Sequence, residues 1–131
     1  MHISRRVFGY LVAAAGLASS TASRSQSAPV TVLIEDTPDG NGRFTPQAVT
    51  IRSGDSVTWS HRGALFHTVT FDPSKVKDGA GVTLPSGVAP FASGDLEQGG
   101  EYKHTFTEKG LYRYVCEYHA AMGMSGSVEV K

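Results

Sequence analysis

Apolar and polar residues alternate in several short runs between residues 30 and 130, and glycine, proline or small polar residues bound each run. The runs are rich in β-branched and aromatic residues, which are typical of β-strands. No apolar period of 3.6 residues persists long enough to predict a core helix. The pattern therefore predicts an all-β sandwich or barrel of seven to eight strands, with runs at residues 30–34, 48–52, 56–59, 66–71, 101–106, 111–115 and 127–130.

The connections between the runs are short except for one. Residues 72–93 form a connection with six glycines and prolines, and a loop of that length is uncommon unless it is functional or partly structured. We expect a helical turn near residues 75–77. The loop at residues 61–65 contains His61, which we expect to be solvated, and His104 alternates with aromatic residues and is expected to pack on the sheet.

The first 28 residues differ in composition from the rest of the chain. They contain paired arginines, Arg5 and Arg6, and no acidic residue; an apolar run at 7–18 follows, and then small residues at 19–22. A basic start, a short apolar stretch and small residues before a cleavage site are typical of an export signal. The arginine pair indicates the twin-arginine route. We therefore assign residues 1–28 to an export signal and a short linker.

The remainder, residues 29–131, has the length of one domain. We expect cleavage after Ala22 and a periplasmic or other extracytoplasmic location; an uncleaved leader would tether the domain at the membrane, although its apolar run is shorter than the ~20 residues of a spanning helix. This domain has nine basic and twelve acidic side chains. Its mild net acidity argues against a nucleic-acid partner, because phosphates require a basic face.

Most of the metal-binding chemistry lies in residues 112–128. This stretch contains the only cysteine, Cys116, together with His119, Met122 and Met124. Thiolate, imidazole and thioether groups are the ligands that bind copper in both oxidation states. A lone cysteine cannot form an intramolecular disulfide, and metal binding would protect its thiol in an oxidising compartment.

The spacing of these residues resembles a known family. Cys-x-x-His-x-x-x-x-Met followed by Met-x-Gly-x-Val, here Cys116 to Val128, resembles the plastocyanin-like branch of the cupredoxins, including the halocyanin, pseudoazurin and amicyanin relatives. A Val-x-Trp segment ending at Trp59 and a histidine in the run at 66–71 match the upstream half of the motif. The resemblance covers residues 30–131 and implies a Greek-key β-sandwich or barrel with a type 1 (blue) copper site.

The resemblance implies four copper ligands: His67, Cys116, His119 and Met124. Met122 is the alternative axial ligand, because it fits the shorter loop of the amicyanin relatives. Met124 alone satisfies both the His-to-Met spacing of the longer loop and the trailing Gly-x-Val, so we favour Met124 and expect Met122 at the surface.

Three positions depart from the plastocyanin pattern. Tyr118 replaces the proline before the loop histidine, and Val115 replaces the surface tyrosine before the cysteine in plant plastocyanins. Thr68 stands where the family has an asparagine that braces the cysteine loop by hydrogen bonds. A hydroxyl group can do part of that work, so the surroundings of the metal differ from those of plastocyanin.

The resemblance also implies what the site does. Such proteins carry single electrons between partners that dock transiently on apolar residues around the loop histidine, here Ala120, Ala121 and Met122 beside His119. We expect a monomer that is not an enzyme, because copper oxidases and nitrite reductases need a second copper site with more histidines than this chain offers. The alternative function is copper storage or delivery, which methionine-rich loops also serve.

Overall fold

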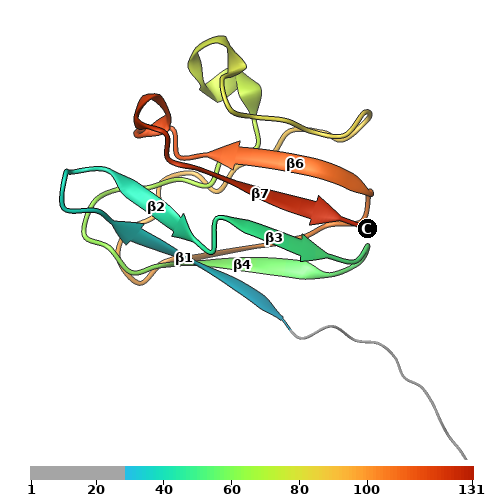
Figure 1. Ribbon diagram of the computed structural model, residues 1–131, viewed down its shortest axis with the longest axis horizontal. Helices are drawn as coiled ribbons and strands as arrows, with labels where there is room; N and C mark the ends of the chain where they lie inside the picture. Colours follow the sequence, from blue (N-terminus) through green and yellow to red (C-terminus); the bar gives the residue numbers. More distant parts are fainter. Residues whose placement is uncertain (1–28) are drawn as a thin grey trace, which may run out of the picture.

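Seven strands form two sheets in residues 29–131, the part of the chain that the computed structural model describes (Figure 1). The predicted leader and its cleavage site lie outside the described residues. The strands are β1 (Val30–Asp36), β2 (Gly42–Thr45), β3 (Ala48–Ile51), β4 (Ser56–His61), β5 (Glu101–Thr105), β6 (Gly110–Val115) and β7 (Ser125–Val130). The prediction of an all-β fold with seven to eight strands is confirmed.

The chain passes between the two sheets three times. One sheet has the order β2-β1-β4-β5 and the other has the order β3-β7-β6. Strands β1 and β4 are parallel neighbours, as are β3 and β7. Parallel pairing requires a crossover connection rather than a tight hairpin. Between β1 and β4 that connection includes β3, which lies in the opposite sheet.

Aromatic side chains fill the space between the sheets. Trp59 of β4 and Tyr114 of β6 meet across the core, with ring centroids 5.3 Å apart and nearly perpendicular planes. Phe71 lies against both rings, at 5.8 Å from Trp59 and 4.9 Å from Tyr114. All three side chains are fully buried. Because alternate residues of a strand point to one face, the period-2 pattern of β4 and β6 places these rings inside.

Two predictions about strands need correction. Residues 66–71 do not form a continuous strand: His67 bridges Leu96, whereas Thr70 bridges both Ala92 and Val115. The segment changes partners along its length, so no ladder of consecutive pairs develops. The short strand β2 was not predicted, because Phe44 is the only large apolar residue among its four.

The long connection contains two short 3₁₀ turns, η1 (Pro73–Lys75) and η2 (Lys77–Gly79), close to the predicted helical turn. No helix within residues 29–131 has the length and apolar character needed to cross a bilayer.

The predicted metal ligands lie at one end of the sandwich. Strands β1 and β6 both end there, at Asp36 and Val115, and β2 and β7 begin there, at Gly42 and Ser125. In Figure 1 this end lies at the left, opposite the C-terminus. The loop that follows β6 therefore lies close to the end of β1, although the two are about 80 residues apart in sequence.

Candidate metal centre

Three side chains converge at this end of the sandwich. His67, Cys116 and His119 each offer one ligand atom, and these atoms lie within 4.8 Å of one another. The Cys116 Sγ atom is 3.7 Å from His67 Nδ1 and 3.4 Å from His119 Nδ1. An ion that binds nitrogen at about 2.0 Å and sulfur at about 2.3 Å holds two such atoms roughly 3–4 Å apart. Both sulfur–nitrogen distances therefore match ligands of a single metal ion.

His67 is fixed by backbone pairing with Leu96 and by burial of its side chain. Its backbone exchanges hydrogen bonds with Leu96, with His67 N donating at 3.2 Å and Leu96 N donating at 2.8 Å, and its side chain is fully buried. Burial lowers the pKa of His67 despite the neighbouring Asp36, so the ring is neutral at neutral pH. A neutral imidazole can present one ring nitrogen as a metal ligand.

The cysteine loop maintains its own shape through backbone hydrogen bonds. Cys116 N donates to Met124 O at 3.1 Å, His119 N donates to Cys116 O at 3.2 Å, and Met124 N donates to His119 O at 3.2 Å. A short 3₁₀ turn, η3 (Ala120–Met122), lies between them and ends at Gly123, whose positive φ of 85° suits glycine. These bonds fix the relative positions of three of the predicted ligands.

The two methionines of the cysteine loop, Met122 and Met124, lie in different environments. Met124 is 1% exposed, whereas Met122 is 52% exposed. A Cβ atom built on Gly42 would lie 2.5 Å from His67 Cε1 and 2.7 Å from Met124 Sδ, so the thioether lies beside the His67 ring. The backbone of Gly42 packs directly on both groups. Met124 therefore lies next to the cluster, and Met122 is at the surface.

Two threonines and a glutamate brace the cysteine loop. Glu117 N donates to Thr68 Oγ1 at 2.8 Å, and Thr70 Oγ1 donates to Glu117 Oε2 at 2.6 Å. The two hydroxyl groups are 2.9 Å apart, and Thr68 must be the donor because the Thr70 proton is already used. The hydrogen bonds form a closed ring that begins and ends on the residue after Cys116. Thr68 thus binds the cysteine loop, as expected for a hydroxyl at this position.

The remaining histidines of the domain differ from each other. His61 was predicted to be solvated, and this is wrong: β4 extends to His61, whose side chain is fully buried. Its Nδ1 accepts from Gly63 N at 3.0 Å and its Nε2 donates to Leu65 O at 2.7 Å, so the polar ring is satisfied inside the protein. His104 stacks on Phe91 with centroids 3.7 Å apart, which confirms that it packs on the sheet.

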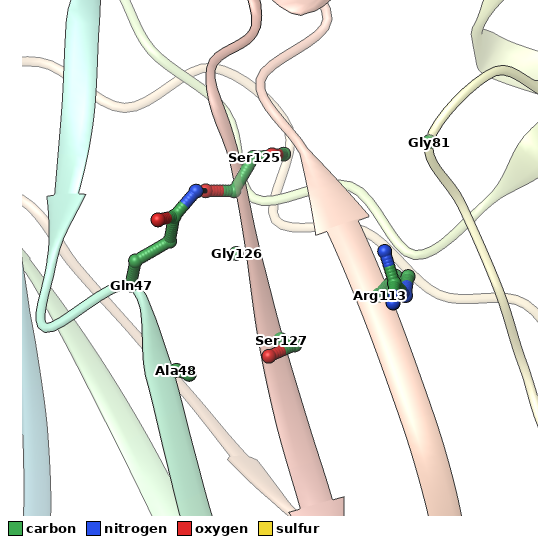
Figure 2. A pocket seen from close by; sticks show the side chains of 7 residues that line it. All are labelled: Gln47, Ala48, Gly81, Arg113, Ser125, Gly126 and Ser127. Atoms are coloured by element: carbon green, nitrogen blue, oxygen red, sulfur yellow. Dashed lines mark hydrogen bonds between the residues drawn. The ribbon is translucent and has the colours of Figure 1, made fainter.

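A separate hollow of about 270 Å³ lies on the outer face of the second sheet (Figure 2). The side chain of Gln47 reaches across it to Ser125, where its Nε2 donates to the backbone oxygen at 3.2 Å. Arg113 of β6 lies on the other side of β7 from Gln47. None of the predicted metal ligands lines this hollow.

Comparison with known proteins identifies the metal. A family model described as copper binding proteins of the plastocyanin/azurin family matches residues 31–131. Plastocyanin A/B of Petroselinum crispum is 36% identical over 93 residues, which are 70% of this chain and 91% of that protein. The chain belongs to the plastocyanin/azurin family. Copper is therefore its cofactor, and the cluster offers thiolate and imidazole groups, which are of the types that bind copper.

Two further proteins are similar to most of this chain. The chloroplastic plastocyanin of Silene latifolia subsp. alba is 36% identical over 124 residues, 93% of this chain and 71% of that protein. The solved structure of amicyanin from Paracoccus versutus has a TM-score of 0.59 and 26% identity, covering 82% of this chain and 85% of that one. These likenesses confirm the plastocyanin-like cupredoxin fold.

Three residues of the site were not predicted. Asp36, Gly42 and Thr70 contact His67, Met124 or Glu117, but each lies far in sequence from the residue that it contacts. The pairing of β1 with β2 and the folding of residues 66–71 bring them into place. The residue types of Asp36, Gly42 and Thr70 do not by themselves indicate a role in the site. The Thr-x-Thr sequence after His67 is consistent with a hydrogen bond between the Thr68 and Thr70 hydroxyl groups.

Replacing Thr68 with valine tests the brace. The variant keeps the shape of the side chain but leaves the Glu117 amide without its acceptor, which we expect to lower the free energy of unfolding of the metal-free protein by about 1–3 kcal/mol. Urea unfolding measures the change. Thr50→Val is the matched control, because Thr50 is exposed on β3; equal changes in both variants would contradict the role of the brace.

Proposed function

We propose that His67, Cys116, His119 and Met124 bind one copper ion as a type 1 centre and that the protein carries single electrons between redox partners. The observation that best supports this is the position of the Cys116 sulfur, which lies within 3.7 Å of one ring nitrogen from each histidine. The buried Met124 thioether beside His67 supports its place as the axial ligand in preference to Met122.

Bound copper supplies a one-electron couple, and a His₂Cys site with a distant thioether suits both of its oxidation states. The contribution of the chain is to fix these side chains before the metal binds. Backbone hydrogen bonds fix the shape of the cysteine loop. The hydrogen-bonded ring of Thr68, Thr70 and Glu117 connects that loop to the segment that carries His67. The backbone of Gly42 packs against the side chains of His67 and Met124. Little then has to move when the charge of the site changes, which favours fast electron exchange.

Electrons would enter and leave near His119, which is partly exposed whereas His67 is not. The predicted docking residues Ala120, Ala121 and Met122 directly follow it. Phe66, Tyr118 and Met122 are all more than half exposed, at 55%, 54% and 52%, and each is close in sequence to a histidine of the cluster. Exposed apolar side chains of this kind suit a small contact area and rapid release of a partner.

We also propose that residues 1–28 direct export by the twin-arginine route and that the copper domain works outside the cytoplasm. The match to the family model begins at residue 31, which supports a domain boundary near residue 29. The arginine pair at Arg5 and Arg6 is the feature that supports this route.

Replacing Cys116 with serine tests the type 1 assignment. The thiolate is the group that gives the intense visible band, so the Cu(II)-loaded Cys116→Ser variant should be colourless or nearly so while the wild-type protein is strongly coloured. Visible absorption at equal copper loading measures this. A band that survives the substitution refutes the assignment, and a wild-type protein that binds only colourless Cu(I) would favour copper storage or delivery.

Replacing each methionine with leucine separates the two axial candidates. Met124→Leu should retain copper but raise the reduction potential, because the sulfur ligand is lost while the apolar volume is kept. Met122→Leu is the matched control and should leave the potential unchanged. Voltammetry of both loaded variants measures the shifts. A large effect of Met122→Leu beside none from Met124→Leu would exchange the two assignments.

A further inference from the structure

We propose that Asp36 is a positioning residue that fixes the proton of His67 on Nε2 and lowers the reduction potential of the site. This inference rests on the proposed copper function. Asp36 is the last residue of β1, and it lies 31 positions from the histidine that it contacts. None of the sequence motifs of the site includes it.

The carboxylate of Asp36 lies between the His67 ring and the loop that follows β4. Its Oδ1 atom is 2.8 Å from His67 Nε2, and its Oδ2 atom accepts from Ala64 N at 2.6 Å and from Leu65 N at 3.2 Å. Gly63 makes this approach possible, because a Cβ atom at that position would overlap the carboxylate. The loop is thus folded around an acidic side chain.

These contacts keep Asp36 ionised. Its Oδ2 atom accepts from two backbone amides, Ala64 N and Leu65 N, as an ionised carboxylate does. An ionised carboxylate only accepts hydrogen bonds, so the single proton of neutral His67 must be on Nε2. The lone pair of Nδ1 then faces the Cys116 sulfur, 3.7 Å away.

The negative charge of Asp36 also affects how strongly His67 would bind the metal ion. A carboxylate that accepts the proton of a ligand imidazole makes the other ring nitrogen a stronger donor, which favours the more highly charged metal ion. His119 has no such partner: within residues 29–131, the hydrogen bonds of its ring include none to a carboxylate. The two imidazoles therefore differ, with His67 buried against an anion and His119 open to the surface.

Glu35 provides a matched control on the same strand. It is the preceding residue, it has a similar exposure to Asp36, and its carboxylate binds Arg43 at 3.0 Å and Thr45 at 2.7 Å instead of the cluster. Glu35→Gln removes one negative charge near the site without touching a ligand. A difference between Asp36→Asn and Glu35→Gln therefore reports the direct hydrogen bond rather than the general field of the protein.

The test compares copper affinities and potentials of the wild-type protein, Asp36→Asn and Glu35→Gln. We expect Asp36→Asn to weaken Cu(II) binding by about 10–100-fold. Cu(I) binding should weaken less, and each tenfold difference between the two corresponds to a rise of about 59 mV in the potential. Glu35→Gln should change either affinity by less than about threefold. Equal shifts in the two variants, or a lower potential in Asp36→Asn, would overturn the proposal.

A second measurement is independent of the metal. Nitrogen-15 NMR of the metal-free wild-type protein should show the His67 proton on Nε2, and Asp36→Asn should show a mixture of tautomers. A wild-type proton on Nδ1 overturns the proposal even if the variant does not fold. If the wild-type protein forms no thiolate–copper absorption band, the proposed function is refuted. If the wild-type protein forms the band but Asp36→Asn changes neither affinity nor potential, only the proposed role of Asp36 is refuted.

Discussion

The chemistry of the protein depends on the approach of the Cys116 sulfur to the rings of His67 and His119. These residues come from two segments about 50 positions apart, and the packing of the two sheets brings the segments together at one end. Trp59, Phe71 and Tyr114 fill the interior between the sheets and link β4, the His67 segment and β6. The aromatic core therefore determines where the ligands meet.

Hydrogen bonds between polar groups then fix the ligands within the packed sheets. Imidazole, hydroxyl and carboxylate groups inside a protein are costly unless each has a hydrogen-bond partner. At this end of the sandwich His61 is satisfied by its own loop, and the ring of Thr68, Thr70 and Glu117 satisfies the backbone beside Cys116. The nitrogen atoms directed at the sulfur are thereby left for a metal ion. We interpret the site as prepared for copper by the hydrogen bonds around it.

The sequence predicted the parts of the structure that local pattern determines. Alternation identified six of the seven strands, and the spacing from Cys116 to Met124 identified the loop, because both signals lie within a few residues. The contacts of Asp36 with His67 and of Gly42 with Met124 depend instead on strand register, which no local pattern contains. The error over His61 has the same origin: a polar residue after Trp59 is typical of a loop, but pairing with β1 continues the strand through it.

The most direct test of the copper site is a titration of the metal-free wild-type domain with Cu(II), followed by visible absorption and electron paramagnetic resonance. We expect one copper ion per chain, an intense visible band and the narrow copper hyperfine splitting of a thiolate-bound type 1 site. A weak band with the wide splitting of ordinary Cu(II), or binding that leaves the Cys116 thiol free to react, would contradict the type 1 assignment.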